Sequence, residues 1–109
     1  MNIYFDTEFT GLVPGTTLIS MGAVTDSGEK FYAEFTDYDK SLVDDWIKSN
    51  VIDTLIFNKN GAVASSSKVF GHIKAEEFLG GDLFTYGNSE IVRENLLIWL
   101  NQFPIYRGY

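Results

Sequence analysis

Two acidic residues near the amino terminus, Asp6 and Glu8, lie two positions apart in an apolar run that begins at Ile3. In an extended strand successive side chains alternate between the two faces, so both carboxylates point the same way, about 6.6 Å apart at a rise of about 3.3 Å per residue. Two like charges held this close are unfavourable unless a cation lies between them, and hard oxygen ligands suit Mg²⁺ or Mn²⁺. The pattern therefore predicts a divalent metal site. The alternative, which the spacing alone favours, is the solvated face of an edge strand.

The chain after this strand predicts two more strands joined by hairpin turns. A turn-rich stretch at residues 13–17 precedes an apolar run at residues 18–24, and Asp26-Ser27-Gly28-Glu29 separates that run from residues 30–35. Apolar runs bounded by Gly, Pro and Asp are typical of strands in a meander. We therefore expect three antiparallel strands between residues 3 and 35.

Residues 3–35 resemble the first motif and the opening meander of the DEDD superfamily of 3′-to-5′ exonucleases, and within it the small bacterial and phage exoribonuclease-like group. The resemblance is carried by Asp6-Thr7-Glu8-Phe9-Thr10-Gly11-Leu12 and by Leu18-Ile19-Ser20-Met21-Gly22-Ala23-Val24. It implies an α/β, ribonuclease H-like fold with a mixed sheet, in which the antiparallel three-strand meander is followed by helices and a parallel fourth strand. We expect one incomplete exonuclease-like domain over residues 1–109.

The resemblance also implies a reaction, hydrolysis of phosphodiester bonds at the 3′ end of single-stranded nucleic acid, with RNA favoured over DNA. Asp6 would bridge two Mg²⁺ or Mn²⁺ ions and Glu8 would bind one of them, and such a pair activates the attacking water and stabilises the leaving oxygen. Four residues of the same motif would contact the terminal nucleotide: the backbone around Thr7 and Phe9, and the side chains of Thr10 and Leu12. For Phe9 and Leu12 the alternative is ordinary core packing.

A complete site of this kind needs two further aspartates and a general base, which the resemblance places after the next long helix. The last helical pattern stops at Phe103-Pro104, and residues 105–109 are expected to form the fourth strand, beside the strand that bears Asp6. No Asp or Glu follows Glu94. We therefore expect a chain truncated at its carboxyl end that carries half of the metal ligands. A catalytically incomplete binding or assembly module is the alternative function.

The single histidine and the remaining acids do not supply the missing ligands. His72 and Glu77 are five positions apart, an offset that does not place both on one stripe of a helix. His72 and Glu76 have the four-residue offset, but a histidine among charged neighbours is typical of a solvated helix. Asp82, which follows two glycines, is typical of a turn.

Periodic apolar positions predict three helices after the meander. The first begins with a cap at Ser41 and continues to about residue 50, the second covers residues 68–78 and stops at Gly80-Gly81, and the third covers residues 90–102 behind a cap at Asn88 or Ser89. Residues 62–67 are expected to form a flexible linker, and residues 83–86 either a short strand or a loop.

A sheet cut short at its fourth strand would leave apolar surface bare. The aromatic residues expected there are Trp99, Phe103, Tyr106 and Tyr109. We therefore expect either self-association into a homo-oligomer or a fragment of something longer.

Composition limits the class of protein further. Hydrophobic content of 45% with 16% aromatic residues excludes disorder, and the absence of cysteine excludes a disulfide framework. No apolar run approaches about 18 residues and no signal-peptide pattern opens the chain, so we expect a cytoplasmic protein without a membrane span. The net charge of −7 argues against a broad nucleic-acid platform. Two bound divalent ions would reverse that argument locally.

Overall fold

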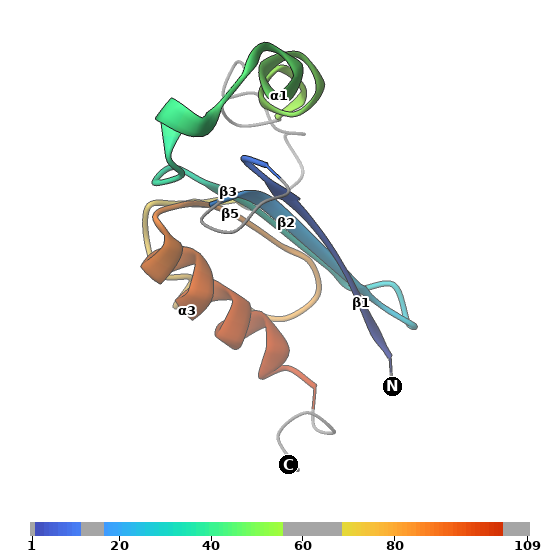
Figure 1. Ribbon diagram of the computed structural model, residues 1–109. Helices are drawn as coiled ribbons and strands as arrows, with labels where there is room; N and C mark the ends of the chain where they lie inside the picture. The colour runs from blue at the N-terminus through green and yellow to red at the C-terminus, as the bar shows by residue number, and fades with distance from the viewer. Residues whose placement is uncertain (1, 12–16, 56–68, 104–109) are drawn as a thin grey trace.

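A computed structural model describes residues 2–11, 17–55 and 69–103 as a twisted sheet with helices on both faces (Figure 1). The elements, in chain order, are β1 (Ile3–Phe9), β2 (Leu18–Thr25), β3 (Lys30–Phe35), the 3₁₀ helix η1 (Lys40–Leu42), α1 (Asp45–Asn50), the 3₁₀ helix η2 (Ile52–Thr54), β4 (Val69–Gly71), β5 (Leu83–Gly87) and α3 (Ser89–Leu100). Within the described ranges, no helix is both long and apolar enough to cross a bilayer.

The five strands of the described sheet are ordered β1-β2-β3-β5-β4. β1, β2 and β3 are antiparallel neighbours, whereas β5 is parallel to β3 and β4 is parallel to β5. This arrangement confirms the predicted α/β class, with an antiparallel meander followed by parallel strands, and it is compatible with a ribonuclease H-like fold. The open choice at residues 83–86 is settled, because they belong to strand β5.

The parallel strands occur earlier in the chain than predicted, and they extend the sheet from β3, on the far side from β1. The strand predicted at residues 105–109 and the linker predicted at residues 62–67 lie outside the described residues. The same holds for Tyr106 and Tyr109. Among the described strands, β1 therefore forms one edge of the sheet.

The prediction of a helix over residues 68–78 is wrong. Val69–Gly71 form strand β4, and the following residues form bends and turns. Phe70 is buried in the core, and its carbonyl oxygen accepts a hydrogen bond from Thr85 Oγ1 at 2.6 Å. His72 has a φ of 57°, which interrupts any helix at that point. Packing of a β-branched and an aromatic residue against the sheet outweighs the helical periodicity.

The helix predicted to begin at Ser41 is also shorter and starts later. Residues 40–42 form only the 3₁₀ turn η1, and α1 begins at Asp45. The cap of α1 is Asp44, whose Oδ1 accepts a hydrogen bond from the Ile47 amide at 2.8 Å. Val43 has an extended backbone conformation, which separates η1 from α1.

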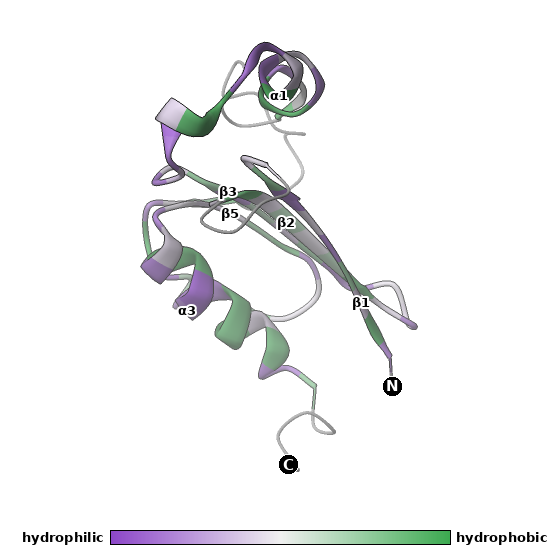
Figure 2. Cartoon of the chain, in the orientation of Figure 1, coloured by the Kyte–Doolittle hydropathy of each residue, from purple (hydrophilic) through white to green (hydrophobic). Residues whose placement is uncertain are grey.

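The final helix was predicted correctly. α3 begins after Asn88, whose Oδ1 accepts a hydrogen bond from the Ile91 amide at 2.9 Å. Figure 2 shows that its carboxyl-terminal half is mostly hydrophobic, whereas its amino-terminal half is mixed. The buried side chains of α3 are Val92, Asn95, Trp99 and Leu100.

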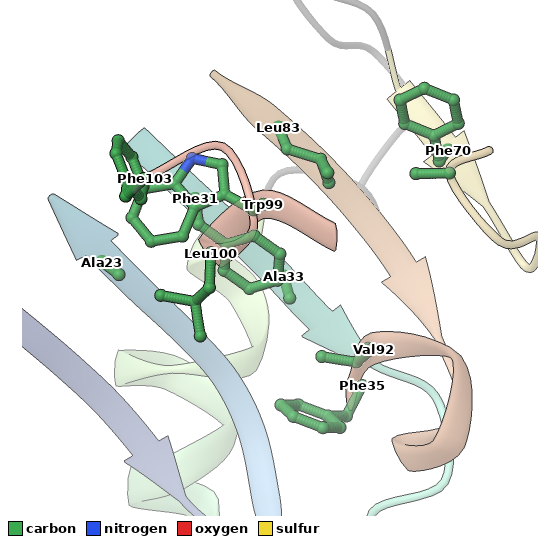
Figure 3. Packing of buried hydrophobic residues seen from close by; sticks show 11 residues of the cluster. Ala23, Phe31, Ala33, Phe35, Phe70, Leu83, Val92, Trp99, Leu100 and Phe103 are labelled. Carbon is green, nitrogen blue, oxygen red and sulfur yellow. The ribbon is translucent and has the colours of Figure 1, made fainter. Parts of the chain in front are cut away.

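The core lies between α3 and one face of the sheet, and it contradicts the expectation that Trp99 and Phe103 are exposed. The Trp99 ring lies 5.8 Å from the Phe31 ring and 5.2 Å from the Phe103 ring, measured between centroids (Figure 3). Trp99 is completely buried, and its indole Nε1 donates to the Gly81 carbonyl at 3.1 Å. The described part of the chain therefore covers its own aromatic residues, and the argument for self-association from this pair fails.

Candidate metal and nucleotide site

Asp6 and Glu8 project from the face of the sheet that α3 does not cover. Their neighbour Phe5 pairs with Ala23, which is buried in the core under α3. Because side chains alternate along a strand, Asp6 and Glu8 both point to the opposite face. Both residues are exposed. Figure 1 shows α1 on this side of the sheet and α3 on the other.

A shift in register at the end of β1 positions α1 beside Glu8. Glu8 pairs with Ser20 but Phe9 pairs with Leu18, so Ile19 has no partner in β1. Such an irregularity redirects side chains. Leu18 packs against the core under α3, whereas Ile19 is buried in a second cluster. The other buried members of that cluster are Ile47, Val51 and Leu55.

A cavity of about 460 Å³, which we call the α1 hollow, lies between the end of β1 and α1. Four residues of the predicted motif line it, namely Thr7, Glu8, Phe9 and Gly11. The other wall consists of Asp44, Trp46, Ile47 and Val51. Trp46 is 67% exposed and Phe9 is 41% exposed, and both residues line this cavity.

Of the other two predicted substrate contacts, Thr10 is not among the residues that line this cavity. Thr10 is buried, and its Oγ1 accepts a hydrogen bond from the Thr17 amide at 2.9 Å. The Thr10 amide donates to the Thr17 carbonyl at 2.9 Å. Thr10 therefore joins the two ends of the loop between β1 and β2. Leu12 lies outside the described residues.

A second cavity of about 490 Å³ lies next to Asp6, and we call it the Gly22 hollow. Asp6, Gly22, Tyr32 and Phe84 are neighbours in one row across β1, β2, β3 and β5. All four line this hollow. The two acids thus stand between two cavities, with Asp6 lining one and Glu8 lining the other.

The two carboxylates fit a hard divalent cation. Among the described residues, no hydrogen bond or ion pair engages either group. Two exposed carboxylates on one face, without a cationic partner in this part of the chain, provide oxygen ligands for Mg²⁺ or Mn²⁺. The described ranges contain no cluster of three or more His, Asp or Glu residues able to hold a metal. The pair on β1 is therefore an incomplete ligand set within these ranges.

His72 and Asp82, which the sequence analysis rejected as metal ligands, make other contacts in the structure. His72 is exposed, as predicted, but it follows β4 instead of lying on a helix, and its ring meets the Tyr86 ring edge-on at 5.0 Å. Asp82 follows Gly80 and Gly81, which both have positive φ, and its Oδ1 accepts a hydrogen bond from the Lys30 amide at 2.8 Å. Asp82 thus connects this turn to the start of β3.

Local sequence patterns do not indicate several of the residues that line the two hollows. Trp46 occupies a position in the expected apolar stripe of its helix, where burial is the ordinary outcome. The short length of α1 leaves this side chain in the cavity wall instead. Tyr32 and Phe84 come together only through the pairing of β3 with β5, which joins residues far apart in the chain.

The comparisons with known proteins support an exonuclease relationship at a coarse level. No family model matches the chain. Two curated proteins of Mycobacterium tuberculosis, from strains CDC 1551 / Oshkosh and ATCC 25618 / H37Rv, are each named as a 3′-5′ exoribonuclease and are 33% identical to the chain over 55 residues. The aligned stretch covers 50% of this chain and 33% of each relative. The match therefore spans only about a third of the length of these relatives.

Proposed function

We propose that Asp6 and Glu8 belong to the active site of a divalent-metal-dependent 3′-to-5′ exonuclease that acts on single-stranded nucleic acid, with RNA favoured over DNA. The observation that carries the proposal is the position of both carboxylates on the face of β1 that α3 does not cover, beside a hollow with an exposed tryptophan. The name of the two mycobacterial relatives supports the reaction and the RNA substrate.

The chemistry divides between the ions and the chain. When bound, two divalent ions supply an activated water and stabilise charge on the leaving oxygen of an in-line displacement. Asp6 and Glu8 would hold them, and the pairing of β1 with β2 fixes the backbone positions of the two residues. No side chain of the protein has to act as a covalent nucleophile.

The α1 hollow suits the terminal nucleotide. A base that enters this cavity meets Trp46, which is 67% exposed, and stacking on an aromatic ring contributes about 1–3 kcal/mol per base without sequence preference. Glu8 lines the same cavity. A nucleotide held there presents its phosphate toward the acids of β1, which is the geometry that removal of a terminal nucleotide requires.

The charge of the protein favours recognition of a strand end over recognition of a long duplex. A net charge of −7 repels phosphates, and proteins that grip long nucleic acids are usually basic. Bound divalent ions make only the region around Asp6 and Glu8 attractive to a phosphate. We therefore expect binding that depends on Mn²⁺ or Mg²⁺ and on a single-stranded end.

A second function is favoured by the small ligand set. Because the described residues contain no group of three or more His, Asp or Glu residues able to hold a metal, a catalytically incomplete module that binds a strand end without cutting it is consistent with the same geometry. The two functions differ in one observable, hydrolysis.

The test combines Mn²⁺ titration with a trimming assay on a 5′-labelled single-stranded oligoribonucleotide. We expect the wild type to bind Mn²⁺ and Asp6→Asn to weaken that binding about tenfold or more, because an anionic ligand is lost. Glu90→Gln is the matched control, since it removes the same charge from an exposed position at the start of α3.

Each outcome has a defined meaning. Mn²⁺-dependent shortening from the 3′ end that Asp6→Asn abolishes supports the exonuclease. Mn²⁺-dependent binding of the oligonucleotide without shortening supports the binding module. Equal Mn²⁺ affinity in the wild type, Asp6→Asn and Glu90→Gln would contradict both.

A further inference from the structure

The Gly22 hollow begins where the α1 hollow ends. Along β1, Glu8 lines the α1 hollow, whereas Asp6 and Tyr4 line the Gly22 hollow on the same face of the sheet. A strand whose terminal nucleotide occupies the α1 hollow therefore passes the two acids and reaches the Gly22 hollow next.

Gly22 forms the floor of this second hollow, and the backbone does not require a glycine there. A Cβ added at Gly22 would meet nothing nearer than the Phe31 carbonyl oxygen, at 3.9 Å, which is an ordinary contact. Gly22 is also absent from the glycines with positive φ. A glycine inside a strand weakens the strand, and it often marks a place where a ligand approaches the backbone closely. The missing side chain leaves space between Asp6 and Tyr32.

The Tyr32 ring beside this space is fixed in place. Its hydroxyl group donates a hydrogen bond to Glu34 Oε2 at 2.6 Å, and Glu34 is completely buried in the sheet. A ring that is already held loses little conformational entropy when a ligand stacks on it. Phe84 extends the aromatic wall on β5.

Lys30 provides a positive charge at the side of the hollow away from Glu8. Lys30 pairs with Val24 on β2, which lies two residues after Gly22 and therefore on the same face of the sheet. The Lys30 side chain is exposed. Its ammonium group is therefore available to a phosphate that lies beyond the base in the hollow. An aromatic wall next to a lysine is the combination that single-stranded nucleic acids bind.

We propose that the Gly22 hollow is the subsite for the nucleotide that precedes the terminal one, with its base against Tyr32 and its 5′-phosphate at Lys30. This inference rests on the proposed function, because it takes the terminal nucleotide to occupy the α1 hollow. It assigns the substrate class more narrowly: strands of at least two nucleotides bind more tightly than a mononucleotide.

The experiment measures, in Mn²⁺, the affinity of the protein for uridine 5′-monophosphate and for the 5′-phosphorylated uridine dinucleotide, which is checked to be intact after titration. We expect the wild type to bind the dinucleotide about tenfold more tightly, in the lower part of the range for one stacked base. Gly22→Leu fills the hollow and should abolish this difference while leaving the mononucleotide affinity unchanged.

Two further variants separate the subsites and guard against misfolding. Lys30→Gln changes only an exposed side chain, and it should lower the affinity for the phosphorylated dinucleotide by about threefold, as expected for loss of one exposed charge contact. Trp46→Ala, in the α1 hollow, should weaken both ligands equally.

The results distinguish the two proposals. If Gly22→Leu and Lys30→Gln both retain the wild-type preference for the dinucleotide, the subsite is overturned while the exonuclease proposal stands. If the wild type shows no preference, the subsite is also overturned. If neither ligand binds in an Mn²⁺-dependent manner, the proposed function itself fails.

Discussion

Asn95 joins α3 to two other parts of the molecule through its side chain alone. Its Oδ1 accepts a hydrogen bond from the Ala75 amide at 2.7 Å, and its Nδ2 donates to the Ile73 carbonyl at 3.0 Å and to Thr85 Oγ1 at 2.8 Å. The residue is completely buried. These bonds provide hydrogen-bond partners for the Ala75 amide and the Ile73 carbonyl. Both groups belong to the irregular segment after β4, where no strand pairing among the described residues supplies partners.

Replacement of Asn95 by leucine should destabilise the fold. Loss of these bonds leaves a buried amide of Ala75 without its partner, and each such group costs about 1–3 kcal/mol, so we expect a loss of about 2–4 kcal/mol in the free energy of unfolding. Urea denaturation measures this loss. Asn101→Ala, at an exposed position after the same helix, should change stability by less than about 0.5 kcal/mol. Equal stability of the two variants would show that the network contributes nothing.

Residues of this kind also mark the limit of sequence analysis. The two-residue period of a strand was enough to place Asp6 and Glu8 on one face, because that inference needs only local geometry. Nothing local indicates that Asn95 lies in the core, since asparagine is usually exposed. Its burial follows from partners about 10 and 20 positions away in the chain.

Among the structural elements, the hairpin turn between β2 and β3 is stabilised by the carboxylate of Glu29. Hydrogen bonds from Ser27 Oγ and from Thr25 Oγ1 to Glu29 lower the pKa of the Glu29 carboxyl below its ordinary value of 4.5. A folded-state pKa below the unfolded value means that the unfolded chain binds more protons in this range. The contribution of Glu29 is therefore complete above pH 4.5 and is lost as the pH falls through the folded-state pKa.

Glu29→Gln should therefore lower stability at neutral pH but not in acid. We expect the difference in unfolding free energy between the wild type and this variant to be constant from pH 7 down to about 5, and then to shrink as Glu29 becomes protonated in the wild type. Denaturation midpoints across this pH range measure it. A difference that is the same at pH 3 and pH 7 would exclude the carboxylate as its source.

Elements with a strong local pattern were predicted correctly, and those decided by distant contacts were not. The hairpins and α3 carry their own turn residues and cap, such as Gly28 and Asn88. β4 has only three residues and is held by its pairing with β5 and by burial of Phe70, so its helical periodicity was misleading. α1 is shorter than predicted for a local reason, because its cap is Asp44 and not Ser41.

At the scale of the whole molecule, the sheet separates the main aromatic core from the candidate site. α3 and the aromatic core occupy one face, and the paired acids, α1 and both hollows occupy the other. The class of fold was predicted from the resemblance that residues 3–35 carry. The hollows did not, because they depend on a shift in register at Ile19 and on the pairing of β3 with β5.

The most direct test of the central claim is an anomalous difference map from crystals of the protein soaked in Mn²⁺. We predict a peak within coordination distance of the Asp6 and Glu8 carboxylate oxygens, and its loss in crystals of Asp6→Asn treated in the same way. The absence of a peak beside these oxygens in the wild type, with Mn²⁺ bound elsewhere or not at all, would contradict the assignment of this pair as a metal site.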